Sequence, residues 1–112
     1  METAPTPAFT DPVSCVDRAL FDHITSKWAM LILATLDGRT LRWSELRRGI
    51  DGITEKMLNQ TLRTLEDDGL VLRTALPVVP PHVEYSLTEA GSEVFALLTP
   101  LLDWIHVRVT KG

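Results

Sequence analysis

The chain has 112 residues and a net charge of −4, and 45% of its residues are hydrophobic. These values suit one globular domain, whose modest core would gain from a partner that covers more apolar surface. The single cysteine, Cys15, excludes an intramolecular disulfide and fits a reducing cytoplasm. The first residues lack the features of a signal peptide, and the longest apolar run, WAMLILA, is too short to span a membrane.

The N-terminal part is predicted to be helical after a short arm. We assign residues 1–13, which include three prolines, to a loose arm and residues 14–112 to one domain. A first helix is expected over residues 14–24, with Ser14 as its cap. A second helix covers residues 27–36, KWAMLILATL, and its apolar residues on nearly every side predict the buried centre of the core.

The middle of the chain has the pattern of two helices joined by a tight turn. A short strand over residues 40–42 precedes a short helix over residues 44–49, and Ile50-Asp51-Gly52 forms the turn. Thr54 is expected to cap a fourth helix that ends near Asp68. Its apolar stripe, at spacings of four and three, consists of Leu58, Leu62 and Leu65.

The C-terminal part predicts a β-hairpin and a long helix. Two strands, residues 71–74 and 83–87, flank a loop that contains three prolines. Thr88 is expected to cap a last helix that runs toward Val109, with a kink at Pro100. The fold class is therefore mainly α with a small β-hairpin wing (α+β), and the order of elements predicts a winged helix-turn-helix.

Charge is unevenly distributed along this fold. A negative total argues against nucleic-acid binding when taken alone. Residues 39–63, however, contain six basic and three acidic side chains, so this segment carries +3 and the rest of the chain carries −7. Because phosphates respond to the local field, the basic segment keeps DNA binding open.

The fourth helix carries the residues that best suit the reading of DNA bases. Lys56, Asn59, Gln60 and Arg63 share one side of it, opposite the leucine stripe, and we call this set the polar face. Asn and Gln can pair with adenine through two hydrogen bonds, and Arg and Lys with guanine. The alternative is an ordinary solvated face, but the preceding helix-turn and the following hairpin favour DNA.

Other residues are candidates for contacts with the DNA backbone. Arg47 and Arg48 on the short helix could hold phosphates and set the register, or could simply be a surface pair. Arg73 on the first strand and His82 near the hairpin tip are the basic candidates of the wing.

Cys15 is a candidate redox sensor. Its position near the start of the first helix, with Arg18 one turn on, would favour the thiolate, although Asp17 opposes this. A thiolate in a dimer could form an intersubunit disulfide or react with a small thiol. The alternative is an inert, partly buried side chain.

The long last helix has more apolar surface than one small domain can cover. Together with Leu20 of the first helix, this surface predicts a homodimer interface, although ordinary packing within the chain is the alternative. The interface residues expected on the last helix are Val94, Leu98, Leu101, Leu102 and Ile105.

The sequence lacks the patterns of a metal site or of an enzyme. The three histidines have no ligand spacing, and one cysteine does not complete a site, so no metal and no cofactor is expected. Nucleophile and phosphate-loop motifs are absent as well, so catalysis is not expected. Trp28, Trp43 and Trp104 are aromatic candidates for an effector pocket, although such residues are more often part of the core.

Several stretches resemble the HxlR-type family of bacterial regulators, within the MarR-like winged-helix group. They are Cys15 followed by Lys27-Trp28, then WAMLILATLDG, RWSELRRGIDGITEKMLNQTLRTLEDDGLVLR and VPPHVEYSLTEAG. The resemblance implies a homodimeric transcription factor, usually a repressor, that reads DNA with the helix beginning at Thr54. It also implies a wing between Arg73 and Tyr85, dimerisation through the first and last helices, and in some members a redox-sensing cysteine at the place of Cys15.

The predicted function is therefore sequence-specific binding of double-stranded DNA at a palindromic operator, by a homodimer that responds to an oxidant or a small molecule. Two alternatives stay open. One is a ligand receptor of the multidrug type, in which the pocket is the main site and release of DNA is its output. The other is a winged helix that contacts only proteins, which the negative charge and weakly basic wing would suit.

Overall fold

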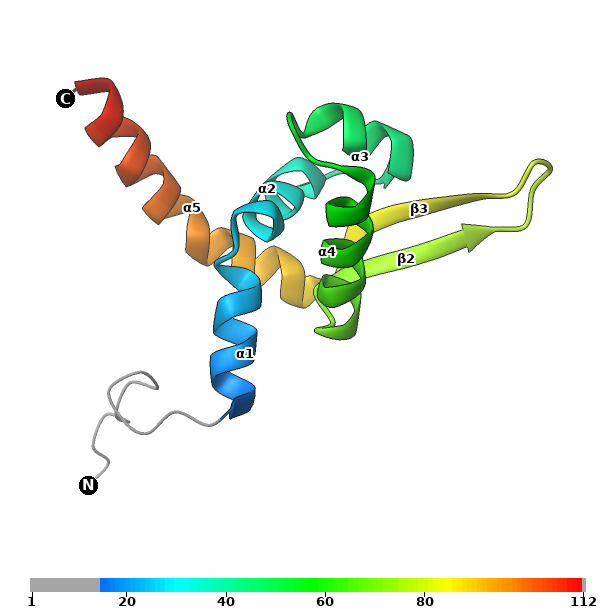
Figure 1. Cartoon of the computed structure of the whole chain (residues 1–112), viewed down its shortest axis with the longest axis horizontal. Helices are drawn as coiled ribbons and strands as arrows, with labels where there is room; N and C mark the ends of the chain where they lie inside the picture. Colours follow the sequence, from blue (N-terminus) through cyan, green and yellow to red (C-terminus); the bar gives the residue numbers. More distant parts are fainter. Residues whose placement is uncertain (1–14, 112) are drawn as a thin grey trace.

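The computed structural model describes residues 15–111, and the side chains of residues 18–111. The predicted arm, residues 1–13, and the predicted cap Ser14 lie outside the described residues. Five helices and three strands follow one another in the order that the sequence predicted (Figure 1). They are α1 (Cys15–Ile24), α2 (Lys27–Leu36), β1 (Leu41–Arg42), α3 (Trp43–Gly49), α4 (Glu55–Asp67), β2 (Val71–Leu76), β3 (His82–Leu87) and α5 (Glu89–Lys111).

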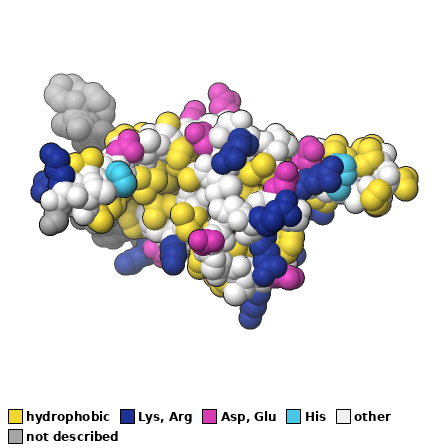
Figure 2. Space-filling view, turned by 90° about the horizontal axis from the view of Figure 1, so that it is seen from above, with side chains coloured by type: hydrophobic (Ala, Val, Ile, Leu, Met, Phe, Trp, Pro, Cys, Tyr) yellow, Lys and Arg dark blue, Asp and Glu magenta, His cyan; other side chains and the backbone are white. Residues whose placement is uncertain are grey.

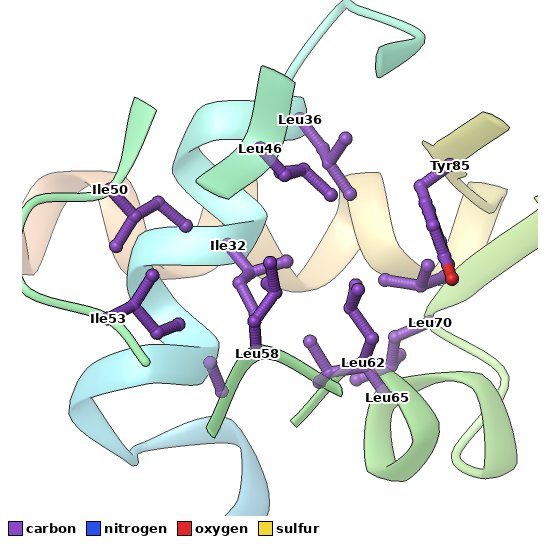
Figure 3. Close-up of a cluster of buried hydrophobic side chains, with 12 residues drawn as sticks. Ile32, Leu36, Leu46, Ile50, Ile53, Leu58, Leu62, Leu65, Leu70 and Tyr85 are labelled. Atoms are coloured by element: carbon purple, nitrogen blue, oxygen red, sulfur yellow. The ribbon is translucent and has the colours of Figure 1, made fainter. Parts of the chain in front are cut away.

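Helix α2 is the centre of the hydrophobic core, as predicted. Ile32, Leu33 and Leu36 are completely buried, and Ser26 caps the helix by accepting a hydrogen bond from the backbone N–H of Ala29. The leucine stripe of α4, Leu46 of α3 and Tyr85 of β3 pack around Ile32 and Leu36 (Figure 3). Several kcal/mol of stability would be lost if a leucine of this cluster were truncated to alanine, about 2–5 by the usual range.

Local chemistry fixes both ends of α4. Thr54 accepts a hydrogen bond from the backbone N–H of Met57 at 3.1 Å, which confirms it as the N-cap. At the other end Gly69 adopts φ +78°, where a side chain would be strained. The backbone N–H groups of Gly69 and Leu70 then return to the carbonyls of Glu66 and Leu65, so the helix closes with a Schellman motif.

The turn between α3 and α4 holds the two helices at a fixed angle. Gly52 adopts φ +81°, which lets the chain reverse within a few residues. The flanking Ile50 and Ile53 are almost fully buried in the core cluster. The predicted helix-turn-helix is therefore anchored by apolar side chains on both sides of its turn.

The three strands form one antiparallel sheet in the order β1-β3-β2. Leu41 of β1 pairs with Tyr85 of β3, and β3 pairs along its whole length with β2. The hairpin extends away from the helices as the wing (Figure 1). The strands are longer than predicted, because Ala75–Val83 and Leu76–His82 also pair, and the prolines that end the ladder start only at Pro77.

Helix α5 begins against the sheet and then leaves the body of the protein on the side opposite the wing (Figure 1). Gly91 is the only buried residue of its 23. The helix runs continuously through Pro100 and ends two residues later than predicted, at Lys111. Helix α3 likewise starts one residue earlier than predicted, at Trp43, because Glu45 accepts a hydrogen bond from the backbone N–H of Arg42.

Candidate nucleic-acid interface

The polar face of α4 points away from the core. Leu58, Leu62 and Leu65 are buried on one side of the helix, and all four members of the polar face are exposed on the other. At 3.6 residues per turn the four residues span an arc of about 100°, with Lys56 and Arg63 in the middle and Asn59 and Gln60 at its two edges. A firmly packed helix therefore presents two cations flanked by two amides.

The two amides have different surroundings. On one edge, Asn59 Oδ1 accepts a hydrogen bond from the indole Nε1–H of Trp43 in α3, at 2.7 Å. On the other edge, Gln60 lines a hollow of about 230 Å³. Asp22 and His23 of α1 and Ser26, the N-cap of α2, also line this hollow. The sequence predicted the shared face but gave no sign of the Trp43 contact, because the two residues are sixteen positions apart and meet only through the turn.

The start of α4 and the adjacent α3 form a second candidate contact area. Arg47, Arg48 and Thr54 line an open hollow of about 570 Å³ beside the turn. The hydroxyl of Thr54 keeps a free proton to donate while its oxygen caps the helix. Arg47 also lies 3.4 Å from Glu55, but both side chains are well exposed, so this pair is weak and phosphate could compete for the arginine.

The wing carries its basic residues on the strands and not at the tip. Arg73 is exposed on β2, opposite Tyr85. His82, predicted near the tip, is the first residue of β3, and its Nε2 lies 4.0 Å from a carboxylate oxygen of Glu84. The tip, residues 77–81, consists of proline and valine, and Figure 2 shows hydrophobic side chains at this end of the molecule. The wing therefore offers phosphate few cations.

A side-chain contact that the sequence did not predict joins α1 to the end of α4. His23 Nδ1 lies 2.8 Å from Asp68 Oδ2, and the carboxylate is largely buried. This contact links the helix expected to join two subunits to the helix that carries the polar face. Its partners are 45 residues apart, a separation at which no local pattern would reveal them.

The three tryptophans proposed for an effector pocket have different surroundings. Trp28 and Trp43 pack against the hydrophobic core, whereas Trp104 is more than half exposed on α5 and carries Arg108 over its ring. Trp43 and Trp104 border two different surface hollows. The fold distributes the three candidates over α2, α3 and α5, and their role in binding an effector stays a prediction.

The predicted dimer residues fall into two groups. Leu20, Leu101 and Ile105 are exposed, whereas Leu98 and Leu102 are half-buried. Val94 packs against the core of its own chain, which weakens it as an interface residue. Val109, which widens the predicted apolar surface, is exposed as well, and so are three large apolar side chains of α5 that were not predicted for the interface, namely Leu97, Trp104 and Val107. Their spacing does not follow a single stripe, because the helix is apolar on more than one side.

Cys15 is the first residue of α1, as the sequence predicted, but its side chain lies outside the described ones. Over the part of the chain that the structure describes, no helix is both long and apolar enough to cross a membrane. The same residues include no cluster of three or more His, Cys, Asp or Glu side chains arranged to hold a metal ion.

The fold and the exposed polar face define a winged helix-turn-helix of the DNA-binding, transcription-regulating class. The model of the HxlR-like helix-turn-helix family matches residues 23–111, and the chain belongs to that family. It is therefore an HTH-type transcriptional regulator in the MarR-like group, as the resemblance implied.

Relatives and solved structures agree with this assignment. The chain is 50% identical over 97 residues to the HTH-type transcriptional regulator YtfH of Escherichia coli, which is 87% of this chain and 77% of YtfH. The structure of YtfH from Salmonella typhimurium matches with a TM-score of 0.80 and 47% identity, over 88% of each chain. The redox regulator HypR in its oxidized form matches with a TM-score of 0.73 and 37% identity, over 80% of this chain and 93% of HypR.

Proposed function

We propose that this regulator is a cytoplasmic repressor that binds a palindromic operator as a homodimer. The observation that carries the proposal is the polar face, exposed on a helix that its own leucines fix to the core. In the complex, α4 lies in the major groove and Arg63 and Lys56 contact base edges. A dimer on its operator excludes other proteins from the same DNA, which is the simplest route to repression.

Contacts outside α4 would set the position of the protein and not its sequence preference. Arg47, Arg48 and Thr54 face phosphates beside the major groove, because they surround the hollow next to the start of α4. Arg73 and His82 contribute weaker contacts from the wing. The negative total charge is compatible with this arrangement, since the +3 segment, residues 39–63, covers α3, the turn and the part of α4 that carries the polar face.

The dimer is supported by the apolar surface of α1 and α5. Leu97 is 79% exposed and Trp104 57%, in a helix with a single buried residue. A patch of this kind on a small chain marks an interface, and two-fold symmetry is the common solution for identical chains. Helix α5 projects away from the wing, and α1 lies in the same half of the molecule (Figure 1).

Selection from a randomised DNA library at moderate salt tests this function. We expect the wild-type protein to enrich two-fold symmetric sites whose half-sites are about 10–10.5 base pairs apart, one helical turn. Leu101→Asp places a charge in the apolar face and should convert the dimer to a monomer that enriches no symmetric site. Sedimentation of the free protein measures the change in mass.

Ser92→Asp is the matched control, because it adds the same charge at an exposed position of α5, close to the sheet. It should remain dimeric and keep the symmetric preference. A wild-type protein that enriches no sequence would refute the DNA function and favour a winged helix that contacts only proteins. A Leu101→Asp protein that stays dimeric would refute the assigned interface.

We also propose that Cys15 makes the regulator responsive to oxidants. Two observations support this: Cys15 begins α1, where a helix N-terminus favours a thiolate, and one structural neighbour is the redox regulator HypR. Diamide should shift the protein to a disulfide-linked dimer on a non-reducing gel and change its DNA affinity. Cys15→Ser should abolish both effects, and a variant that keeps the wild-type response on DNA would refute the role of Cys15.

A further inference from the structure

The hydrogen bond between Trp43 and Asn59 fixes which way the Asn59 amide faces. An indole N–H can only donate, and an amide nitrogen has no lone pair to accept, so the acceptor must be the amide oxygen, Oδ1. The donor–acceptor distance of 2.7 Å is that of a good hydrogen bond. The oxygen of Asn59 therefore faces α3, and its NH2 group is directed away from that contact.

Trp43 is the rigid partner of this pair. Its ring is half-buried and packs against the hydrophobic core, at the first position of α3. Asn59 is exposed and would otherwise rotate freely about its side-chain bonds. The core holds the indole ring in place, so its N–H is presented in a fixed direction at the protein surface, where the Asn59 oxygen accepts from it.

This arrangement changes what Asn59 can recognise. A two-bond pair with adenine requires the amide oxygen and the NH2 group to face the base edge together, because adenine presents N7 as an acceptor and its N6 amino group as a donor. Here the oxygen is directed at the protein, so that pair would cost the Trp43 hydrogen bond. Guanine presents two neighbouring acceptors, N7 and O6, to which the NH2 group can donate without losing the Trp43 bond, whereas adenine offers that group N7 alone, beside its own N6 donor.

We propose that Trp43 is a positioning residue that orients Asn59 as a hydrogen-bond donor, so that the regulator selects guanine over adenine at one position of each half-site. The inference rests on the proposed DNA function. It also revises the expectation from sequence, in which Asn59 was a candidate reader of adenine.

Two substitutions separate the donor role from an ordinary contact. Trp43→Phe keeps an aromatic ring but removes the N–H, which frees the amide to pair with adenine. In selection from randomised DNA, adenine should gain about fivefold or more at that one position relative to wild type, with the other positions unchanged. Asn59→Asp still accepts from Trp43 but has no donor, so its preference should move to cytosine, whose amino group donates.

Free protein provides a check that needs no DNA. In Asn59→Ala, one of the three tryptophan indole N–H signals in a ¹H–¹⁵N spectrum should move and the other two should stay. Asn59→Asp alters only an exposed side chain, so it tests the proposal even where Trp43→Phe fails to fold.

The possible outcomes test the positioning role of Trp43 separately from the proposed DNA-binding function. A wild-type protein that enriches no sequence overturns both. Enriched sites that keep the same base at this position in Trp43→Phe, or that show adenine there in wild type, overturn the positioning role and leave the DNA function in place. A change of preference at several positions in Trp43→Phe would indicate a general loss of structure and also overturn the proposal.

Discussion

Arg63→Ala is expected to abolish the preference of the regulator for its operator over random DNA. Arg63 lies in the middle of the exposed polar face, where its guanidinium can make two hydrogen bonds to guanine. One such pair contributes about 1–3 kcal/mol of discrimination, and a dimer uses it twice, so the specificity ratio should fall by about 30-fold or more. Titrations of operator and random DNA at the same salt concentration measure the ratio.

Arg63→Lys is the matched control for this prediction. It keeps the positive charge but loses the planar fork that makes two parallel hydrogen bonds. Its non-specific affinity and salt dependence should therefore stay close to wild type while the operator preference falls. An unchanged specificity ratio in both variants would show that the polar face of α4 does not read the bases.

Gly91→Ala is expected to have the largest effect on stability. A Cβ at this position would overlap the carbonyl oxygen of Leu70, and that oxygen is part of the backbone and cannot rotate away. The Leu70 oxygen also accepts a hydrogen bond from the N–H of Thr88, whose hydroxyl donates to the Gly69 carbonyl and accepts from the Gly91 N–H. Any movement of α5 to relieve the overlap would break these bonds.

Forcing a methyl group into a packed site usually costs about 1–3 kcal/mol, and the rigid backbone here places Gly91→Ala at about 3 kcal/mol or more. For a chain of this size we expect Tm to fall by about 10 °C or more. Ser92→Ala, at the next position and exposed, should change stability by no more than about 0.5 kcal/mol. Both are measured at one protein concentration, since the proposed dimer would make Tm depend on concentration. A Gly91→Ala protein as stable as Ser92→Ala would contradict the close approach.

Local sequence patterns determined the elements and most of their ends. Thr54 caps α4 and Gly69 ends it as predicted, because capping depends on hydrogen bonds between residues a few positions apart. The hairpin strands were predicted too short, because their outer pairs depend on the partner strand and not on local composition. The burial of Ala29, Ile32, Leu33 and Leu36 in α2 followed directly from its largely apolar sequence.

The sequence by itself also determined the family, the polar face of α4 and the apolar excess of α5, because each is a periodic or contiguous pattern within one segment. Only the tertiary structure decided how those residues are oriented and paired. The contact of His23 with Asp68 and the bond from Trp43 to Asn59 each join segments that are distant in the sequence. These contacts form only when the core brings the helices together, so the periodicity of a single helix cannot predict them.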